Sequence, residues 1–192
     1  PPRSTLFPYT TLFRSIDRYG IGMDVAADDP EVRAYGFDHV CQVVDDGENL
    51  HNDDAYTQYL RGKGLLEEFR AACRDGAWRC DPHPFAPEDT VDGFIARQGI
   101  AHLQGLSADR PFYLNLSFVG PHPPYWHPGE MPVPPDQQSP PIGAPDTPAT
   151  RLRRAHYTAR CALIDRWVGE VVQVLRTRGW LDNTVEIGRA HV

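Results

Sequence analysis

The sequence predicts an α/β protein, in which helices pack against a β-sheet. An apolar segment that favours a strand covers residues 114–119, and helical patterns precede and follow it at residues 87–106 and 152–178. A further strand is expected to begin near Thr184. Helices that alternate with strands along a chain are typical of sheets covered by helices, and this order predicts the α/β class.

Shorter elements are expected in the first half of the chain. Residues 34–44, AYGFDHVCQVV, favour a strand or a strand-like piece. Residues 53–75 favour two short helices that are interrupted by two glycines, because glycine is unfavourable inside a helix. Asp53 or Asp54 is expected to cap the first of these helices, since a carboxylate can accept hydrogen bonds from its unpaired N–H groups.

Apolar residues at helical spacing predict the two longer helices. In the first, residues 87–106, Glu88 and Asp89 suit the positive N-terminal end of the helix. The second, residues 152–178, is expected to end at Gly179. The apolar stripes expected on the two helices are, first, Val91, Phe94, Ile95, Ile100, Ala101 and Leu103 and, second, Tyr157, Cys161, Ile164, Val168, Val171 and Leu175.

Composition excludes several classes of protein. The 192 residues carry a net charge of −7 and are 41% hydrophobic. No segment approaches the roughly 20 consecutive apolar residues of a transmembrane helix, and no stripe of basic residues suits a nucleic acid. The four cysteines form no C-x-x-C motif, so a zinc site is not expected. Cys73 and Cys80 are left as either a disulfide or unpaired thiols.

The two ends of the chain are expected not to be native protein. PPRSTLFPYTTLFRS, residues 1–15, corresponds codon for codon to a common short-read sequencing adapter, and EIGRAHV, residues 186–192, fits the start of the opposite adapter. Translated segments of this kind are removed before a fold is considered. The natural sequence is therefore expected to cover about residues 16–185.

A histidine among prolines follows the strand expected at residues 114–119. The segment LNLSFVGPHPPYWHPGE places His122 between Pro121 and Pro123, directly after the pattern of the strand is broken. Proline restricts the backbone on both sides of the histidine. The segment alone leaves two interpretations open, an ordinary loop histidine or a functional side chain held at the end of a strand.

Three stretches together resemble the sulfatase family of the alkaline-phosphatase-like superfamily. The first, residues 89–125, ends in P-H-P-P, and the second, residues 155–185, contains D-x-x-x-G followed by L-D-N-T. A weaker third stretch joins residues 31–40 to residues 59–65. The resemblance implies an incomplete mixed sheet flanked by helices, with the active site at the carboxyl ends of the strands.

The resemblance also implies an activity, that of an arylsulfatase-like sulfuric ester hydrolase acting on a small-molecule or glycan sulfate ester. Sulfatases use a formylglycine nucleophile and a divalent cation, usually calcium. By resemblance, His122 contacts the sulfate and acts as a general acid toward the departing oxygen. His127 is a second candidate for the same substrate pocket, and its alternative is a solvent-exposed loop histidine.

The sequence departs from the family pattern at the nucleophile and the metal ligands. None of the four cysteines lies in C-x-P-S-R, and the acidic pairs that bind the metal are missing. Asp165 is expected to make a structural contact on its helix, and Asp53 and Asp54 are expected to cap a helix. We therefore expect no metal ligand in this chain and no activity of the chain alone.

Two alternatives remain at the level of the sequence. A phosphodiesterase or phosphonate hydrolase of the same superfamily acts on esters of the same tetrahedral, anionic geometry. A protein of another class is a non-catalytic interaction module, in which the proline-rich residues 121–148 serve as a polyproline ligand.

Overall fold

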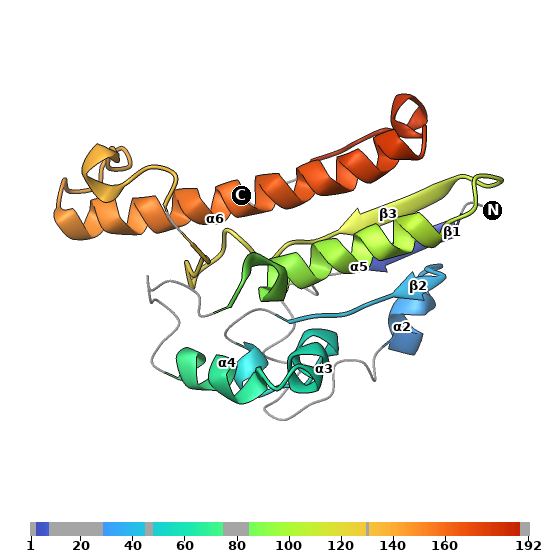
Figure 1. Ribbon diagram of the computed structural model, residues 1–192, viewed down its shortest axis with the longest axis horizontal. Coiled ribbons are helices and arrows are strands. Elements are labelled where there is room, and N and C mark those ends of the chain that lie inside the picture. Colours follow the sequence, from blue (N-terminus) through green and yellow to red (C-terminus); the bar gives the residue numbers. More distant parts are fainter. Residues whose placement is uncertain (1–2, 8–28, 45–47, 75–84, 130, 189–192) are drawn as a thin grey trace.

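The computed structural model describes residues 3–7, 29–44, 48–74, 85–129 and 131–188. Long helices pack against a small parallel sheet (Figure 1), which confirms the predicted α/β class. The strands are β1 (Arg3–Phe7), β2 (His39–Val40) and β3 (Phe112–Leu116), and the helices are α2 (Asp29–Arg33), α3 (Ala55–Gly62), α4 (Leu66–Cys73), α5 (Val91–Gly105) and α6 (Pro148–Thr177). Among the described residues, none of these helices has the length and apolar character needed to cross a membrane.

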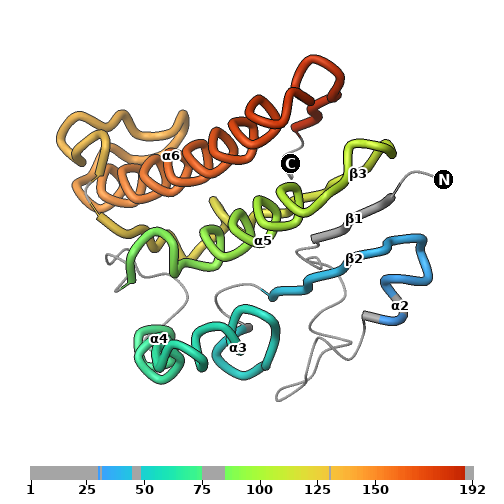
Figure 2. Tube along the Cα trace, turned by 45° about the vertical axis from the view of Figure 1, so that its right-hand side comes forward, coloured from blue at the N-terminus to red at the C-terminus, as the bar shows by residue number. Residues whose placement is uncertain are grey.

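The sheet has the strand order β2-β1-β3, and both pairings are parallel. Figure 2 shows α5 lying alongside β3. In the middle strand, Thr5 lies opposite His39 on one side and opposite Leu114 on the other. Because the strands are parallel, their carboxyl ends lie at the same edge of the sheet. β1 belongs to the segment expected to be translated adapter, and its pairing does not test that expectation.

β3 differs from the expected strand 114–119, since it covers Phe112–Leu116. Its limits coincide with the register of β1, in which Phe7 pairs with Leu116. Beyond that point the N–H groups of Val119 and Gly120 donate to a side chain of α5. Pairing with β1 and this side-chain contact therefore set the end of β3.

Two other strand predictions were only partly correct. The strand expected within residues 34–44 is reduced to His39–Val40, and a turn follows α2 before it. The strand expected from Thr184 is not formed in the described residues 184–188, which follow a single 3₁₀ turn at Leu181–Asn183.

The predicted pair of short helices is confirmed as α3 and α4. Asp54 caps α3 by accepting hydrogen bonds from the N–H groups of Thr57 and Val44, at 2.7 Å and 2.8 Å. The Thr57 hydroxyl bonds back to the N–H group of Asp54, completing a capping box. Gly64, between the helices, has φ of +73°, a conformation that favours glycine.

α5 and α6 confirm the two longer helices, but α5 begins only at Val91, after a 3₁₀ turn at Pro87–Asp89 that holds Glu88 and Asp89, and α6 begins earlier than expected, at Pro148. Thr90 caps α5 by accepting a hydrogen bond from the N–H group of Gly93 at 3.1 Å. α6 ends as predicted, with Gly179 at φ of +68° and the N–H group of Trp180 donating to the Leu175 carbonyl at 2.9 Å. α5 packs against both β3 and α6, so it links the sheet to the long helix.

The apolar stripe predicted for α6 was partly wrong. Leu175 is buried, but Val168 is 41% exposed, and Ala101 on α5 is also exposed. The buried residues of α6 are Ala155, His156, Ala159, Arg160, Trp167 and Leu175. Small and polar residues therefore occupy the inner face of the first half of α6. The polar ones have buried partners, since His156 contacts His127 and Arg160 contacts Asp92.

The apolar core consists of two clusters that support opposite ends of α5. The larger one contains Tyr56, Phe69, Phe94 and Trp126 beside α3, α4 and the start of α5. The smaller one contains Leu103, Leu106 and Leu175, with Phe112 and Trp180 packed against it. Trp126 lies in the loop after β3, so the larger cluster also anchors that loop.

One predicted cysteine pairing lies partly outside the described residues. Cys73 is buried at the end of α4, whereas Cys80 falls within 75–84, which the structure does not describe. The choice between a disulfide and unpaired thiols for these two residues stays a prediction.

Candidate functional site

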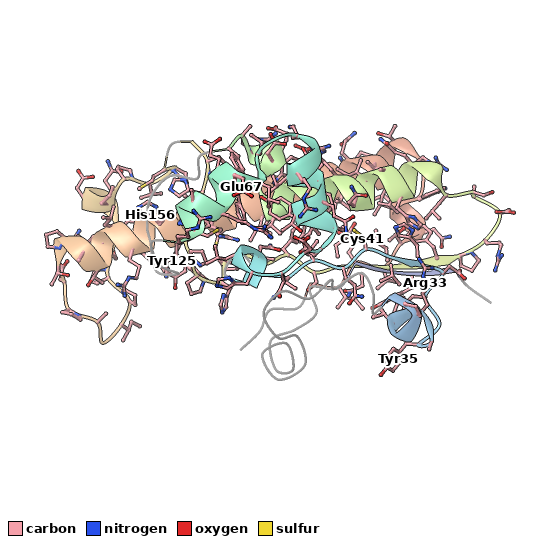
Figure 3. All side chains as sticks on the ribbon, turned by 90° about the horizontal axis from the view of Figure 1, so that it is seen from below. Arg33, Tyr35, Cys41, Glu67, Tyr125 and His156 are labelled. Carbon is pink, nitrogen blue, oxygen red and sulfur yellow. The ribbon has the colours of Figure 1, made fainter. Side chains whose placement is uncertain are left out.

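The candidate site is the loop that leaves the carboxyl end of β3. It runs over residues 117–127 and passes between the first turn of α5 and the inner face of α6. Figure 3 labels Tyr125 of this loop and His156 of α6, and it shows Tyr125 beside the part of α6 that carries His156. The loop is at the edge of the sheet where all three strands end, which is where open α/β sheets bind ligands.

His122 is exposed at the tip of this loop. Its Nδ1 lies 2.7 Å from the carbonyl oxygen of Pro123, and its backbone N–H donates to the Val119 carbonyl at 3.3 Å. A carbonyl oxygen can only accept, so Nδ1 carries the hydrogen. The other ring nitrogen, Nε2, is a proton donor when the ring is charged and an acceptor when it is neutral.

Asp92 and Arg160 lie beneath the loop, and the sequence patterns did not single out either residue. The side chain of Asp92 is 1% exposed and that of Arg160 is 2% exposed. Their Oδ2 and Nη2 atoms are 3.2 Å apart, and both side chains also bond to the backbone of the loop. The one sequence signal was that Arg160 follows His156 by four residues, which places both on one face of the helix.

His127 is buried at the far end of the loop, and its alternative interpretation as a solvent-exposed loop histidine was wrong. Its Nε2 lies 3.0 Å from Nδ1 of His156. One nitrogen must donate and the other accept, so at least one of the two rings is neutral. Burial lowers the pKa of His127, and the positive charge of Arg160 acts in the same direction. The assignment of His127 to a substrate pocket stays a prediction.

Two aromatic residues fix the second half of the loop. Trp126 is 5% exposed and meets the ring of Phe69 edge to face, with ring centres 6.3 Å apart. Tyr125 meets Tyr157 of α6 in the same manner at 6.0 Å. Edge-to-face aromatic contacts of this kind add to the stability of the packing. The exposed His122 therefore stands on a loop whose neighbouring residues are packed.

Of the two aspartates expected to cap α3, Asp54 does so, whereas Asp53 forms ion pairs instead. Asp54 is buried and caps the helix, and burial raises the pKa of this carboxyl to about 6. Asp53 forms ion pairs with Arg61 and Arg70. Its partial burial raises its pKa, but the hydrogen bonds and charges of the two arginines outweigh that effect and hold the pKa below its usual value.

The described residues do not fit a divalent metal site. Within the parts of the chain that the structure describes, no three histidine, cysteine, aspartate or glutamate residues are grouped so that they could hold a metal ion. Asp165, which belongs to the D-x-x-x-G motif, is exposed on α6.

Comparisons with known proteins agree with this architecture. The crystal structure of a phosphonate monoester hydrolase of Agrobacterium radiobacter is similar, with a TM-score of 0.61 at 21% sequence identity. The similarity covers 94% of this chain and 43% of that enzyme, so the chain spans less than half of its length. At this identity the likeness shows a shared fold. No curated protein matches the chain.

The sequence itself identifies the family. The family described as Sulfatase matches residues 14–186, which is most of the chain. The match includes β2, α3 to α6, β3 and the loop that carries His122. It confirms the resemblance found in the three sequence stretches. The chain belongs to the sulfatase family.

Proposed function

We propose that the chain is the central part of an arylsulfatase-like catalytic domain, which hydrolyses sulfate esters and uses His122 as a general acid. The observation that carries this proposal is the state of the His122 ring. It is exposed at the carboxyl edge of the sheet, and Nδ1 is engaged by the Pro123 carbonyl. We propose that Nε2 of the charged ring donates a proton to the bound ester.

The proposed role of His122 concerns the bond to the departing alcohol. When that bond breaks, negative charge develops on the ester oxygen, and a proton from Nε2 neutralises it. The described residues supply neither a nucleophile context nor metal ligands. We therefore assign the formylglycine nucleophile and the calcium or other divalent cation of the family to parts of the full-length enzyme outside this chain.

The proposal includes the origin of the chain. We infer that residues 16–185 are native and that residues 1–15 and 186–192 are translated adapter sequence. The family match supports this division, because it covers residues 14–186 and leaves out most of both end segments. Sequencing the source DNA across both junctions tests it. Native coding sequence that continues through Ser15 would refute it.

A second candidate is hydrolysis of phosphonate monoesters or phosphodiesters. The supporting observation is the similar fold of the phosphonate monoester hydrolase of Agrobacterium radiobacter. Sulfate and phosphonate esters share tetrahedral geometry and negative charge, so a histidine at this position can serve either reaction. Contacts elsewhere in the full-length enzyme would decide between the two substrates.

The interaction module receives less support from the packing. Trp126 and His127 are buried, and Arg151 of α6 donates to the carbonyl of Gln138 at 2.8 Å. These contacts hold the proline-rich segment against the body of the chain. A polyproline ligand needs an extended segment that is free to enter a groove, so we do not propose this function.

The decisive experiment uses the protein encoded by the uninterrupted gene, here called the full-length enzyme. It is assayed with an aryl sulfate, an aryl phosphonate monoester and an aryl phosphodiester at equal concentration. We expect the highest kcat/KM for the sulfate ester, and a loss of activity in His122→Ala that becomes larger as the leaving alcohol becomes poorer. A higher kcat/KM for the phosphonate or the phosphodiester would favour the second candidate. The absence of all three activities would refute both.

A further inference from the structure

We infer that Asp92 and Arg160 form a buried clamp that positions His122. The clamp consists of these two side chains, one from the first turn of α5 and one from the inner face of α6. The inference rests on the proposed role of His122 and extends it to two residues that do not touch the substrate. Its evidence is a set of hydrogen bonds that hold the loop on both sides of the histidine.

The first half of the clamp is Asp92. Its Oδ1 atom accepts hydrogen bonds from the backbone N–H groups of Val119 and Gly120, at 2.8 Å and 3.1 Å. Both groups belong to the segment in which the chain leaves β3. A carboxylate oxygen that binds two successive N–H groups fixes the orientation of that peptide segment. The approach to His122 is thereby set by α5.

The second half of the clamp is Arg160. Its Nη1 atom donates to the carbonyl oxygens of Pro124 at 2.6 Å and Trp126 at 3.4 Å. Its Nη2 atom donates to Oδ2 of Asp92 at 3.2 Å. The planar guanidinium thus joins the outgoing side of the loop to the aspartate that holds the incoming side.

The residues between the two anchored sides have little freedom. Gly120 and Pro124 are bound by the clamp, and the three residues between them are Pro121, His122 and Pro123. Proline fixes φ, so few backbone angles remain adjustable. Once both sides are held, the position of the His122 ring depends mainly on its own side-chain torsions and on the contact with the Pro123 carbonyl.

Gly120 shows how closely the loop lies on the clamp. A Cβ atom at this position would lie 2.6 Å from Nε of Arg160 and 2.9 Å from Oδ2 of Asp92. It would also lie 2.7 Å from Cδ1 of Ile164. These separations are shorter than van der Waals contact, so any side chain at position 120 would displace the clamp. The loop and the clamp therefore form one packed unit.

The energetics of buried charges favour a positioning role over a purely stabilising one. Burying two opposite charges carries a desolvation cost that their attraction often only balances, and apolar residues can frequently replace such a pair. What apolar residues cannot supply is the set of four hydrogen bonds to one loop. The geometry of the loop is thus the property that depends on Asp92 and Arg160.

The test uses conservative variants in the full-length enzyme. Asp92→Asn keeps the shape of the side chain, but its amide N–H₂ group faces the guanidinium donors. Arg160→Lys keeps the charge but cannot reach three acceptors in one plane. Gly120→Ala displaces the clamp without removing a charge. The matched control is Arg166→Lys, because Arg166 lies on the same helix in a half-exposed ion pair with Glu170 at 3.1 Å.

The first measurement is hydrogen exchange of the peptide that covers residues 117–127. We expect the three clamp variants to lose protection at the N–H groups of Val119 and Gly120 by at least about tenfold, whereas Arg166→Lys leaves it unchanged. This measurement does not depend on catalysis. If protection persists in all three variants, the clamp does not hold the loop, and the inference is wrong whatever the substrate of the enzyme.

The second measurement separates positioning from general damage to the fold. Each clamp variant is combined with His122→Ala, and kcat is measured with an ester of a poor leaving alcohol. We expect the clamp variants to lose about 10- to 100-fold in kcat when His122 is present, within the contribution typical of a general acid. In the His122→Ala background they should lose almost nothing more, because the clamp acts through that ring. Equal losses in both backgrounds would refute the inference.

The two measurements distinguish failure of the inference from failure of the proposed function. If His122→Ala leaves all activity intact while the exchange of residues 117–127 responds as expected, the general-acid role of His122 has failed and the clamp holds a loop of another purpose. That result would refute the inference that the clamp positions a catalytic group. If exchange and the double variants both respond as expected, the inference is supported.

Discussion

His122 combines exposure with a fixed orientation, and this combination makes its role testable. Its Nδ1 is held by the Pro123 carbonyl, while the ring remains exposed. In the full-length enzyme, we expect His122→Ala to lower turnover of esters with poor leaving alcohols by about 10²–10⁴-fold. Activated aryl sulfates should lose far less, because a nitrophenolate departs without a proton. The measurement is kcat for a series of esters that differ in the pKa of the alcohol.

The control for this series is His122→Gln. An amide can form a hydrogen bond but cannot act as a comparable acid. We expect it to restore part of the binding, seen in KM, and little of the turnover of poor leaving alcohols. Equal losses on activated and unactivated esters would mean that His122 only positions the sulfate. No loss in either variant would mean that it is an ordinary loop histidine.

Asp54 provides a second prediction at this scale, concerning pH. Burial raises the pKa of its carboxyl from 3.8 to about 6 in the folded protein. Between these values the folded state binds more protons than the unfolded state, so this contribution to stability is complete below about pH 4 and is lost as the pH rises through 6. A difference of about two pKa units corresponds to about 3 kcal/mol. The opening free energy of α3 should decrease by up to that amount between pH 4 and pH 7.

Hydrogen exchange of the peptide that covers α3, corrected for the intrinsic effect of pH, measures this decrease. The matched variant is Asp54→Asn, because asparagine caps a helix about as well as aspartate but does not titrate. The pH dependence of α3 should be flatter in the variant. An identical pH dependence in both proteins would show that Asp54 is not responsible.

The sequence singled out the exposed residue of the candidate site but not the buried residues that lie beneath it. His122 was recognisable because its proline neighbours are adjacent in the chain. Arg160 and Asp92 are 68 residues apart, and each is a charged residue on a helix that local patterns would place in solvent. Their burial follows from contacts between α5, α6 and the loop, which hydropathy and spacing do not contain. The burial of His127 was missed for the same reason.

At the scale of elements, two glycines of the long helices lead to opposite predictions. A Cβ atom at Gly93 of α5 would lie 2.1 Å from the backbone carbonyl oxygen of Pro87, whereas a Cβ atom at Gly169 of α6 would meet nothing within 4 Å. Gly93→Ala must therefore shift the turn Pro87–Asp89 and should destabilise the full-length enzyme by about 1–3 kcal/mol. Gly169→Ala should stabilise it by about 0.5–1 kcal/mol, because alanine favours the helix.

The thermal unfolding midpoint of each variant checks this pair of predictions. Because the two changes add the same methyl group to a helix, each variant is the control for the other. A higher midpoint for Gly93→Ala would contradict the close approach of the turn to α5. A lower midpoint for Gly169→Ala would mean that α6 has a partner at this position in the full-length enzyme.

Helix limits were predictable to the extent that neighbouring residues set them. Asp54 caps α3, and Gly179 follows the end of α6 at a positive φ. Strand limits depend on a partner, and the end of β3 at Leu116 follows from its register with β1. The face that α6 turns toward the core also depends on a partner. Arg160 is buried on that face, and Val168 is left 41% exposed. Helix limits were therefore predictable from neighbouring residues in the chain. Strand limits and the buried face of α6 depend on tertiary contacts.

At the scale of the whole molecule, the middle strand of the sheet is the one whose native origin is in question. β1 lies between β2 and β3, in the segment that we assign to adapter sequence. A strand at the edge of a sheet offers unpaired N–H and C=O groups, and a segment that favours strands can pair with them. If the assignment is correct, another strand of the full-length enzyme occupies this place. The two native strands keep the parallel arrangement that brings the loop after β3 to the edge of the sheet.

The last prediction concerns the 192-residue chain by itself. Within the described residues, β2 and β3 each pair on one side only, and several large apolar side chains are exposed, among them Tyr113 at 54% and Ile142 at 108%. Open strands and exposed apolar surface favour association between copies. We therefore expect the isolated chain to self-associate and to lack a cooperative thermal transition as a monomer, which sedimentation and calorimetry measure.

The same chain should show no turnover of an aryl sulfate above that of its His122→Ala variant, and it should bind calcium no better than an unrelated acidic protein. The physical reason is that a general acid alone accelerates departure of the alcohol but cannot attack sulfur, and the described residues hold no group of metal ligands. The full-length enzyme is the positive control in both assays. Turnover by the isolated chain that depends on His122 would show that a nucleophile lies within these 192 residues. A monomer with one sharp transition would show that they form a complete folding unit, and either result would require the proposed division of the enzyme to be redrawn.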